Sequence, residues 1–545
     1  MRRLTRGAAL LGAALTLATP AVVGAQTQGP SGPARGVEGP RVTPPVRATV
    51  DDLAPTRTYS APYLLVDPAN KKNIVASAVE MRTRLCRLLR STDGGQSWKL
   101  LEALPGLPSY PFCFNTAGMQ TESPMAWGRD STLYYGLNGW DTQDGGNRGN
   151  QSVLLARSSD LGDTWNTTIV RNARGFTDAL VENNTPVSSV AVDTSGERDV
   201  VYVGWRKALP NQTNPTYPRA PFMAVSTDGG ETWGDPIDIQ AKYPKTAKDA
   251  AGKDVPYVMS FNAVSMATDD KGTLYLIYPL NTTGITPAPP VPIVMGVSRD
   301  KGATFEFFDV SPPSVYVEHV NILKWSPAGG PQGSLHVVYE DKVNQPPTGA
   351  DRDIYHQRST DGGRTWTAAK MLNDDDPSKL AVQITPNIDV TPEGRVDAVW
   401  WDFRDDRGQI ATDVYYTHSL DNGDTWTKNV RLTDKSVSRR IGVWTGADIR
   451  QPPGVASLEE YAIVGWDDTR LGDETTHTQD IFTRAVQFKA LGTGQNDAVR
   501  YALGAMLGLA AVGVVLLIFS VVARSRSGPV EARTERKDVA KAGKT

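Results

Sequence analysis

The sequence predicts an all-β protein, a seven-bladed β-propeller with four strands per blade, followed by one membrane-spanning helix near the C-terminus. Three observations predict this architecture: a motif that recurs six times, a composition of 50 Gly, 38 Pro and 13 Trp in 545 residues, and an uncharged apolar segment over residues 501–523. Abundant Gly and Pro are typical of short strands joined by tight turns. Because 545 residues exceed one ordinary compact core, an internal repeat is the expected way to build the fold.

The repeat motif reads Ser-x-Asp-x-Gly-x-Thr-Trp, with Ser in place of Thr in the first copy and Phe in place of Trp in the fourth. Its aspartates recur every 60 to 72 residues, which suits one four-stranded blade with its loops. Asp accepts hydrogen bonds from turn amides, Gly permits a positive φ angle, and Trp packs between neighbouring units. We therefore expect the motif aspartates to be structural, and neither catalytic nor calcium-binding. They are Asp93, Asp160, Asp228, Asp300, Asp361 and Asp421.

Strand patterns around the motif divide the chain into seven units, and a six-bladed ring is the alternative. The seventh unit has strands over residues 461–466 and 480–488 but neither the motif nor a fourth strand. We expect an extended piece near residues 46–50 to supply the missing outer strand, since closing the ring removes exposed sheet edges. The units begin near Ser60, Glu122, Thr185, Ser260, Val317, Ala381 and Gly442.

The two ends of the chain predict export and anchoring. A basic start, an apolar run and small residues at 23–25 predict a cleaved signal peptide. Residues 501–523, at about 1.5 Å per residue, cross the hydrocarbon core as one helix, and the basic tail behind them lies in the cytoplasm. We expect a monomeric ectodomain outside the cell membrane. The predicted order is signal peptide 1–25, Pro/Gly-rich leader 26–45, propeller 46–488, stalk 489–500, transmembrane helix 501–523 and cytoplasmic tail 524–545.

Charge, cysteine and histidine usage restrict the function classes. The net charge is −3 with Lys and Arg scattered, so nothing indicates a nucleic-acid-binding surface. Cys86 and Cys113 are the only cysteines, and an even pair in an oxidising compartment predicts a disulfide between them. The five histidines show no metal-ligand spacing, so neither a metal nor another cofactor is expected.

The repeat motif is the Asp-box, or BNR repeat, and residues 46–488 resemble the sialidase superfamily of propellers. Sialidases of this superfamily hold the sugar carboxylate with three arginines, and they use a glutamate-activated tyrosine as nucleophile and an aspartate as acid/base. Their first arginine lies in a Phe/Tyr-Arg-Ile-Pro motif, whereas the opening strand here, from Arg57 to Asp67, has no Arg-Ile-Pro. Asp-box propellers also include binding receptors and assembly factors, so any reaction has to be argued from a site.

The ends of the second strands lie on the face opposite the repeat motifs, together with the loops between blades. Aromatic rings beside carboxylates and arginines recur there, a chemistry suited to sugars or to an acidic ligand. A Trp-Asp-Arg pattern occurs twice, at Trp401 and at Trp466, and such repetition also suits a packing and salt-bridge device between blades. The candidate ligand-binding residues are Arg82, Arg206, Trp401, Arg404, Trp466 and Arg470.

Hydrolysis of a glycosidic bond requires two carboxyl groups, or a Tyr-Glu pair plus an acid, that converge across the bond. Weak candidates for these roles are Asp402, Asp467 and Glu340. Tyr316 and Glu318, at positions i and i+2 of one strand, share a face, although a lone pair of this kind is more often incidental.

Two functions follow from these observations. The first is a membrane-anchored extracellular propeller that recognises glycans or another acidic ligand and, if it is an enzyme, hydrolyses them as an exo-α-sialidase-like glycoside hydrolase. The second is a non-enzymatic platform that docks or assembles an exported protein on the outer face of the membrane.

Overall fold

The computed structural model shows a seven-bladed all-β propeller, so the propeller part of the predicted fold is confirmed and the six-bladed alternative is wrong. All described residues belong to one compact unit of the chain. The structure describes residues 40–50, 56–83, 85–102, 124–140, 151–171, 187–208, 219–248, 252–259, 264–281, 292–313, 322–341, 352–376, 381–406, 408–442 and 451–488.

Blades 1 to 3 each contain four antiparallel strands that follow one another from the inner to the outer edge. Blade 1 consists of β3 (Tyr59–Val66), β4 (Ile74–Glu80), β5 (Leu85–Ser91) and β6 (Lys99–Leu100). Blade 2 consists of β7 (Met125–Trp127), β8 (Leu133–Trp140), β9 (Gln151–Ser158) and β10 (Asn166–Arg171). Blade 3 consists of β11 (Val187–Asp193), β12 (Val200–Ala208), β13 (Arg219–Ser226) and β14 (Ile237–Asp238).

Blades 4 to 6 repeat this order, and the short strand β17 (Val258–Met259) pairs with both β13 and β19 and so joins blades 3 and 4. Blade 4 consists of β18 (Ser265–Thr268), β19 (Leu274–Asn281), β20 (Ile293–Ser298) and β21 (Glu306–Asp309). Blade 5 consists of β22 (Ile322–Ser326), β23 (Ser334–Asp341), β24 (Asp353–Ser359) and β25 (Lys370–Met371). Blade 6 consists of β26 (Gln383–Val390), β27 (Val396–Asp402), β28 (Ala411–Ser419), β29 (Val430–Arg431) and β30 (Val437–Ser438).

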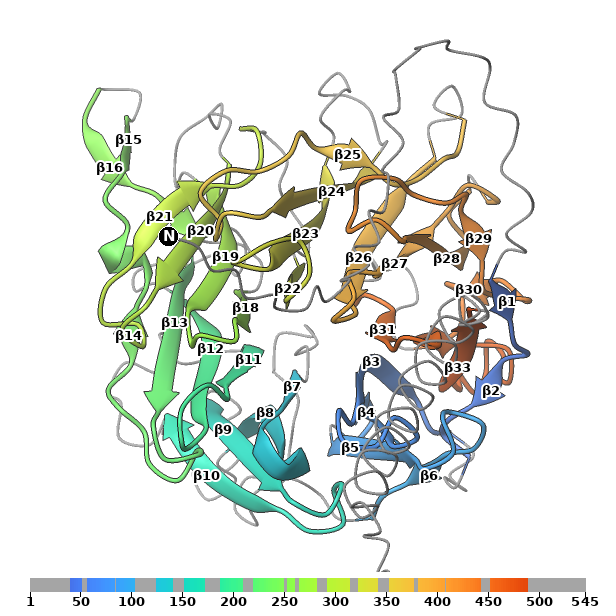
Figure 1. Ribbon diagram of the computed structural model, residues 1–545. Helices are drawn as coiled ribbons and strands as arrows, with labels where there is room; N and C mark the ends of the chain where they lie inside the picture. Colours follow the sequence, from blue (N-terminus) through green and yellow to red (C-terminus); the bar gives the residue numbers. More distant parts are fainter. Residues whose placement is uncertain are drawn as a thin grey trace, which may run out of the picture. The chain divides into compact units, whose positions relative to one another are not determined.

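The first strand of every blade lies at the centre of the ring. These inner strands contact one another in blade order, and the circle closes where the inner strand of blade 7, β31 (Gly454–Ser457), contacts β3 of blade 1 (Figure 1). Each blade buries apolar side chains against its neighbours, so the hydrophobic core is divided among the interfaces between blades. The 3-10 turn η1 (Arg129–Ser131) connects β7 to β8 in blade 2. The 3-10 turn η2 (Gln240–Lys242) and the hairpin of β15 (Thr246–Lys248) and β16 (Asp254–Pro256) follow β14 in the chain.

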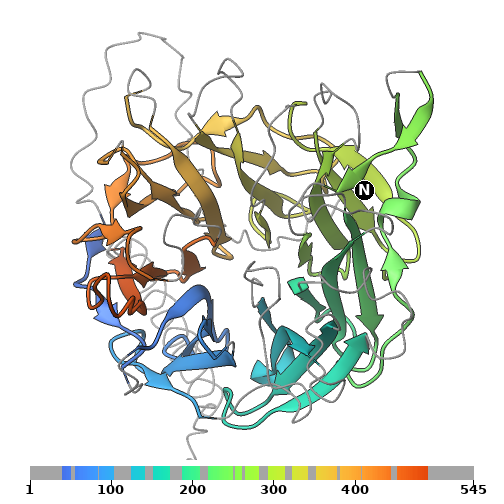
Figure 2. The same ribbon diagram turned by 180° about the vertical axis from the view of Figure 1, so that it is seen from behind.

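The N-terminal segment closes the ring in the way that the sequence predicts. Blade 7 contains β31, β32 (Tyr461–Asp468) and β33 (Asp480–Gln487) from the end of the propeller. The outer positions are taken by β1 (Arg41–Val42) and β2 (Val46–Arg47), which both pair antiparallel with β33 (Figure 1 and Figure 2). The seam between blades 7 and 1 is therefore held by segments from both ends of the propeller.

The six repeat motifs form one turn with the same internal hydrogen bonds. In every copy the serine hydroxyl donates to the aspartate at 2.7–2.8 Å and accepts the amide of the motif glycine at 2.7–3.0 Å. The residue four positions after the aspartate donates to it through both amide and hydroxyl, as Thr232 does to Asp228. Hydrogen bonds from Ser226 and Thr232 hold the pKa of Asp228 well below its usual range. The carboxylate of each motif aspartate is thus hydrogen-bonded within its own turn.

The motif glycine is required by both conformation and space. Its φ angle lies between 85° and 91° in the six copies, a left-handed conformation that disfavours other residues. In the last copy a Cβ atom on Gly423 would lie 2.6 Å from the ring of His356 in the preceding blade. The glycine therefore also sets how closely two blades approach.

Several predictions concern residues outside the described ones. Among the described residues no helix is long and apolar enough to cross a membrane, and the segment 501–523 is not one of them. The signal peptide, the stalk and the cytoplasmic tail also lie outside them. Cys86 on β5 is disulfide-bonded, whereas Cys113 is not described, so their pairing stays a prediction.

Candidate functional site

The two tryptophans proposed as ligand platforms are buried between blades. Trp401 is 1% exposed, and its indole N–H donates to the carbonyl of Gln451 at 2.9 Å. Trp466 is fully buried, and its N–H donates to Asp468 at 2.8 Å. Both rings belong to the apolar cluster shared by blades 6 and 7, so neither face is available to a ligand. The expectation of open aromatic platforms on this rim is therefore corrected.

Arg404 is a connector between blades 5 and 6. Its guanidinium contacts Asp402 at 2.8 Å in its own blade and Asp374, which follows the outer strand of blade 5, at 2.8 Å. It also lies over the ring of Tyr415, with 4.2 Å between Cζ and the ring centroid. Asp402 is fully buried and accepts the indole N–H of Trp400 at 2.8 Å. Neither Asp402 nor Arg404 therefore faces an open site.

Arg470 repeats this arrangement one blade later. It contacts Asp468 and Asp434, each at 2.8 Å, and it lies over the ring of Phe482. Asp434 follows the outer strand of blade 6 as Asp374 follows that of blade 5. The equivalent tryptophans are Trp400 and Trp466, since each donates to the aspartate two positions later, so the repeat begins at Trp400 and not at Trp401. The interpretation as a device between blades fits this geometry.

The carboxylate of Asp467 fastens the seam between blades 7 and 1. It accepts the Ser60 hydroxyl, the amide of Ala61 at 3.1 Å and the side-chain amide of Gln479 at 3.1 Å. Ala61 has a φ angle of 62° and lies at the bulge in the pairing of β3 with β4, between Ser60 and Tyr63. Burial raises the pKa of Asp467 to about 7, against the opposing hydrogen bonds from Ser60 and Ala61. This pKa comes from a closed interface and not from an open catalytic cleft.

Glu340 and Asn138 have the same function at two other blade interfaces. Glu340 is fully buried and accepts a hydrogen bond of 2.7 Å from the amide of Thr385. Thr385 lies near the start of β26, the inner strand of the next blade. Asn138 accepts the amide of Val187, at the start of β11, at 2.7 Å. Arg352 also approaches Glu340, with 3.5 Å between the charged atoms. Acceptors at the ends of second strands thus position the next blade.

The remaining predicted residues are not brought together. Arg82 is exposed, and its side chain donates to Thr58 at 3.1 Å and to the carbonyl of Thr476 across the seam. Arg206 lies on β12. Tyr316 and Glu318 lie outside the described residues. Within the described part, the predicted arginines and carboxylates do not converge on one point.

These contacts predict that Arg404→Gln and Arg470→Gln affect stability and not ligand recognition. Each change removes a pair of charge-assisted bonds, while the buried aspartate keeps donors such as the Trp400 indole and the amide of Arg404. We expect each variant to lower the free energy of unfolding by about 1–3 kcal/mol. Urea titration measures this, with Arg299→Gln as the control because the Arg299–Glu306 pair is 46% and 55% exposed. Unchanged stability with lost ligand binding would contradict the structural role.

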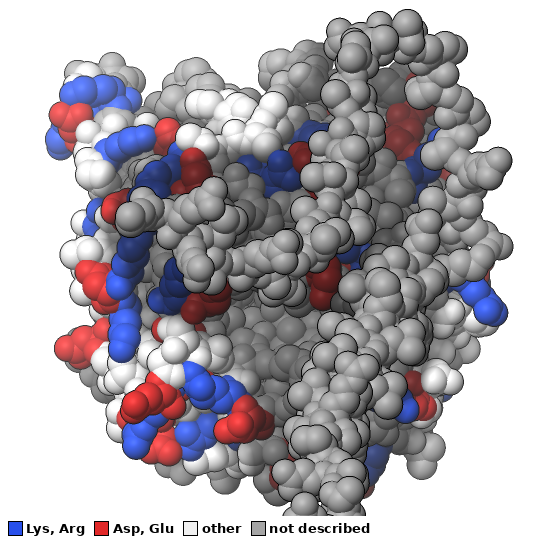
Figure 3. Space-filling view, in the orientation of Figure 1, with Lys and Arg blue, Asp and Glu red and all other residues white. Residues whose placement is uncertain are grey.

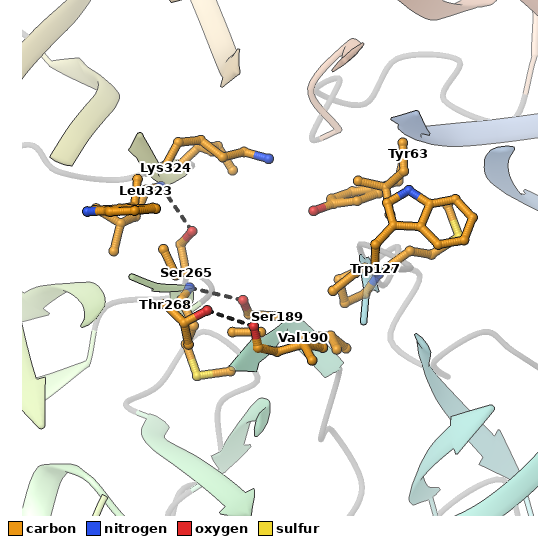
Figure 4. Close-up of a pocket in the computed structure, with 18 of the residues that line it drawn as sticks. Tyr63, Trp127, Ser189, Val190, Ser265, Thr268, Leu323 and Lys324 are labelled. Atoms are coloured by element: carbon orange, nitrogen blue, oxygen red, sulfur yellow. Dashed lines mark hydrogen bonds between the residues drawn. The ribbon is translucent and has the colours of Figure 1, made fainter. Parts of the chain in front are cut away.

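A cavity of about 260 Å³ lies at the centre of the ring, where all seven inner strands contribute residues (Figure 4). Three aromatic side chains line it: Tyr63 from β3, Trp127 from β7 and Trp325 from β22. The indole N–H of Trp127 is buried and has no hydrogen-bond partner among the described residues. The cavity wall therefore contains three aromatic residues, while the indole N–H of Trp127 is buried behind its surface.

Lys324 is the charged residue among the described lining residues of the central cavity, and it forms an ion pair with Asp389, which does not line the cavity. Lys324 Nζ lies 3.3 Å from Asp389, and both side chains are only partly exposed, at 25% and 21%. Burial lowers the pKa of Lys324, but the Asp389 carboxylate outweighs it and raises that pKa well above its usual range. Asp389 is itself fixed by the amide of Ser457 at 2.7 Å. In Figure 4 the Lys324 amine and the Tyr63 hydroxyl extend towards one another across the cavity.

Small hydroxyl side chains hold the cavity wall together. Ser189 accepts the amide of Met266 and Ser265 accepts the amide of Leu323, both at 3.0 Å, so each serine links its inner strand to the next (Figure 4). Thr268 donates to the carbonyl of Val192 at 2.8 Å. Sequence reasoning missed this site because its residues come from seven strands that lie far apart in the chain and share no motif. Aromatic residues at inner-strand positions, such as Trp127 and Trp325, are the signal that was present.

Other chemistries have less support in the described part of the chain. No group of three or more His, Cys, Asp or Glu side chains there is arranged to hold a metal ion. Basic and acidic side chains lie interspersed on the described surface seen in Figure 3.

Comparison with solved structures finds propellers of several kinds. The fold is similar to that of a Dyadobacter fermentans protein of unknown function, with 14% identity, a TM-score of 0.44 and coverage of 83% of this chain and 100% of the other. It is also similar to Penicillium chrysogenum α-L-arabinanase bound to arabinobiose, with 13% identity, a TM-score of 0.40 and coverage of 82% and 99%. Trypanosoma rangeli sialidase with the inhibitor DANA matches with 13% identity, a TM-score of 0.37 and coverage of 69% and 56%.

At these identities and TM-scores the likeness concerns the fold alone. No model of a known protein family matches the sequence, and no curated protein matches it significantly.

Proposed function

We propose that this chain is an exported propeller, anchored in the cell membrane by residues 501–523, that recognises a glycan in its central cavity. The observation that carries the proposal is a central cavity whose lining includes Tyr63, Trp127, Trp325 and Lys324, the last of which is paired with Asp389. Aromatic faces suit the apolar faces of sugar rings, and a neighbouring amine suits their hydroxyl groups. A docking platform for an exported protein is the alternative.

The charges of the cavity favour a neutral sugar ring over a carboxylated one. Lys324 and Asp389 are one cation and one anion 3.3 Å apart, so together they contribute no net charge. The amine keeps further N–H groups for a sugar oxygen. The volume of about 260 Å³ lies below the range of about 300–1,000 Å³ for drug-sized ligands. A single sugar ring at the end of a glycan is therefore the proposed ligand.

Recognition without hydrolysis is the better-supported form of this function. The candidate acids Asp402, Asp467 and Glu340 are buried and engaged by Arg404, Ala61 and Thr385 respectively. Asp389 is the carboxylate that lies in an ion pair with a lining residue of the central cavity. The described lining residues of the central cavity include no carboxyl group, whereas glycoside hydrolysis requires two that converge across the bond.

A glycan array probed with the purified full chain in detergent tests the proposal, followed by calorimetry with the best neutral glycan. We expect Trp127→Leu and Lys324→Gln each to weaken binding about tenfold or more, which corresponds to about 1.4 kcal/mol. Lys245→Gln is the matched control, since Lys245 pairs with Asp309 on the exposed surface.

The proposal fails if the folded protein binds no glycan, or if binding is unchanged in Trp127→Leu. We expect no release of 4-methylumbelliferone from its α-ketoside of N-acetylneuraminic acid. Turnover that disappears in Arg404→Gln and Arg470→Gln would instead support the sialidase-like interpretation.

A further inference from the structure

We propose that Asp389 is a positioning residue for the central cavity, which fixes the Lys324 amine as a charged donor to the ligand without touching the ligand itself. Lys324 is one of the lining residues of the cavity, whereas Asp389 is not. The two charged groups lie 3.3 Å apart. The inference rests on the proposed function, since the ligand that the amine meets is the glycan in that cavity.

The main chain beside Lys324 is held on both sides, but its amine is not. The amide of the preceding residue donates to the Ser265 hydroxyl of blade 4 at 3.0 Å. The Ser326 hydroxyl donates to the carbonyl of Thr391 in blade 6 at 2.9 Å. A lysine carries its amine on a flexible four-carbon stem, so these bonds leave the amine free to move. The ion pair with Asp389 is the contact that holds it in place.

The carboxylate of Asp389 is itself fixed by two blades. Asp389 lies on β26 of blade 6, and its Oδ2 accepts the amide of Ser457, on β31 of blade 7, at 2.7 Å. Its Oδ1 faces Lys324. Its cross-strand neighbour Asp397 pairs with Arg395 at 3.0 Å and therefore has its own cation. Three blades thus determine where the amine lies.

The other titratable side chains around Lys324 do not replace Asp389. His336, the cross-strand neighbour of Lys324, is neutral because burial lowers its pKa to about 3. Tyr63 lies across the cavity (Figure 4). Burial lowers the pKa of Lys324, whereas Asp389, and to a smaller extent Tyr63, raise it by more. Without the carboxylate, the amine is expected to lose its proton at a lower pH.

Reductive methylation with ¹³C-formaldehyde, followed by an NMR titration of the full chain in detergent, tests this step without any ligand. The Lys324 signal is the one that is absent from Lys324→Gln. We expect Asp389→Asn to lower its titration midpoint by about one pH unit or more. Asp309→Asn is the matched control, because it removes the carboxylate from the exposed Lys245–Asp309 pair and should leave the Lys324 signal unchanged. An unchanged midpoint in Asp389→Asn would overturn the inference.

A double-mutant cycle measured by calorimetry tests whether Asp389 acts on the glycan through Lys324. At pH 7 we expect Asp389→Asn to weaken binding of the best neutral glycan about tenfold. In the Lys324→Gln background the same change should alter binding less than about twofold, since its effect passes through the missing amine. Additive losses would overturn the positioning role. The Kd of Asp389→Asn should also rise through its Lys324 midpoint while the wild-type Kd stays constant, which a general loss of packing does not predict.

Asp389→Glu keeps the test informative if Asp389→Asn does not fold. It retains the negative charge but moves the carboxylate by one methylene group, so we expect Lys324 to stay protonated while glycan binding weakens. Wild-type affinity in Asp389→Glu would contradict the positioning role. The two proposals fail separately. A folded wild type that binds no glycan contradicts the proposed function, whereas additive losses in a protein that binds contradict only the role of Asp389.

Discussion

Replacing Asp480 with Asn is expected to lower the free energy of unfolding by about 3–5 kcal/mol, the cost of breaking a buried ion pair. The Asp480 side chain is 1% exposed, and it pairs with Arg47 at 3.0 Å and Arg57 at 2.9 Å. It also accepts the Thr49 hydroxyl at 2.6 Å. The change leaves two partly buried arginines without their shared carboxylate at the seam. Urea titration followed by tryptophan fluorescence measures the loss.

Hydrogen exchange shows whether this loss arises at the seam. The amides of Thr43 and Ala48 donate to Ala485 and Ile481 on β33, so they should exchange faster in Asp480→Asn. Asp309→Asn is the control, because the Lys245–Asp309 pair is 55% and 49% exposed and is expected to contribute at most about 1 kcal/mol. The proposed role of Asp480 at the seam is contradicted if both variants lose the same free energy of unfolding. It is also contradicted if the amides of residues 43–48 stay protected from hydrogen exchange in Asp480→Asn.

Acidification below pH 6.5 is expected to destabilise the interface between blades 5 and 6. His336 and His356 are buried, with 3.0 Å between Nδ1 of the first and Nε2 of the second. Burial lowers the pKa of His336 to about 3 and the pKa of His356 well below its ordinary value, and the Arg358 charge lowers both further. Both rings are therefore neutral in the folded state at neutral pH. If both rings were protonated, both facing nitrogens would carry a hydrogen, and neither could accept the hydrogen bond between His336 and His356.

The sign follows from proton linkage. Between the unfolded pKa of about 6.5 and the folded pKa, the unfolded chain binds more protons, so stability falls as pH falls. Above pH 6.5 the free energy of unfolding keeps the full contribution of the two neutral histidines. Below pH 6.5 it decreases by about 1.4 kcal/mol for each pH unit and each histidine, so protonation linked to His336 alone lowers it by about 2 kcal/mol at pH 5. Denaturant titrations from pH 7.5 to 4 measure the slope.

Two variants separate titration from general loss of packing. His336→Gln keeps an amide beside Asn422 and should make the pH slope shallower. Val338→Ala, a fully buried apolar position on the same strand, should lower stability equally at every pH. A slope that His336→Gln leaves unchanged would assign the acid sensitivity to other groups.

Local patterns in the sequence were sufficient for the architecture. The repeat motif closes its hydrogen bonds within eight residues, as from Ser91 to Trp98, so its presence reports a turn without any tertiary information. The interval between copies indicates the blade, and the missing strand of the last unit indicates the seam that β2 completes. These features depend on residues that are close together in the chain, so they can be recognised from the sequence alone.

The side chains at the strand ends required the tertiary structure. Trp401, Arg404 and Asp467 have the residue types of a sugar site, but the next blade decides whether they meet a ligand or another strand. A shift of one residue along a strand moves a side chain to the other face, which is why Trp400 and not Trp401 matches Trp466.

By itself, then, the sequence determined the blade unit, the motif turns and the closing strand, because these rest on contacts local in the chain or on a repeated period. The choice of seven blades over six came from the structure. Only the tertiary structure decided the central cavity around Lys324 and the ion pairs of Asp480 at the seam. Arg47 and Asp480 lie 433 residues apart, and no local pattern relates them. They meet because the ring closes, and closure is a property of all seven blades together.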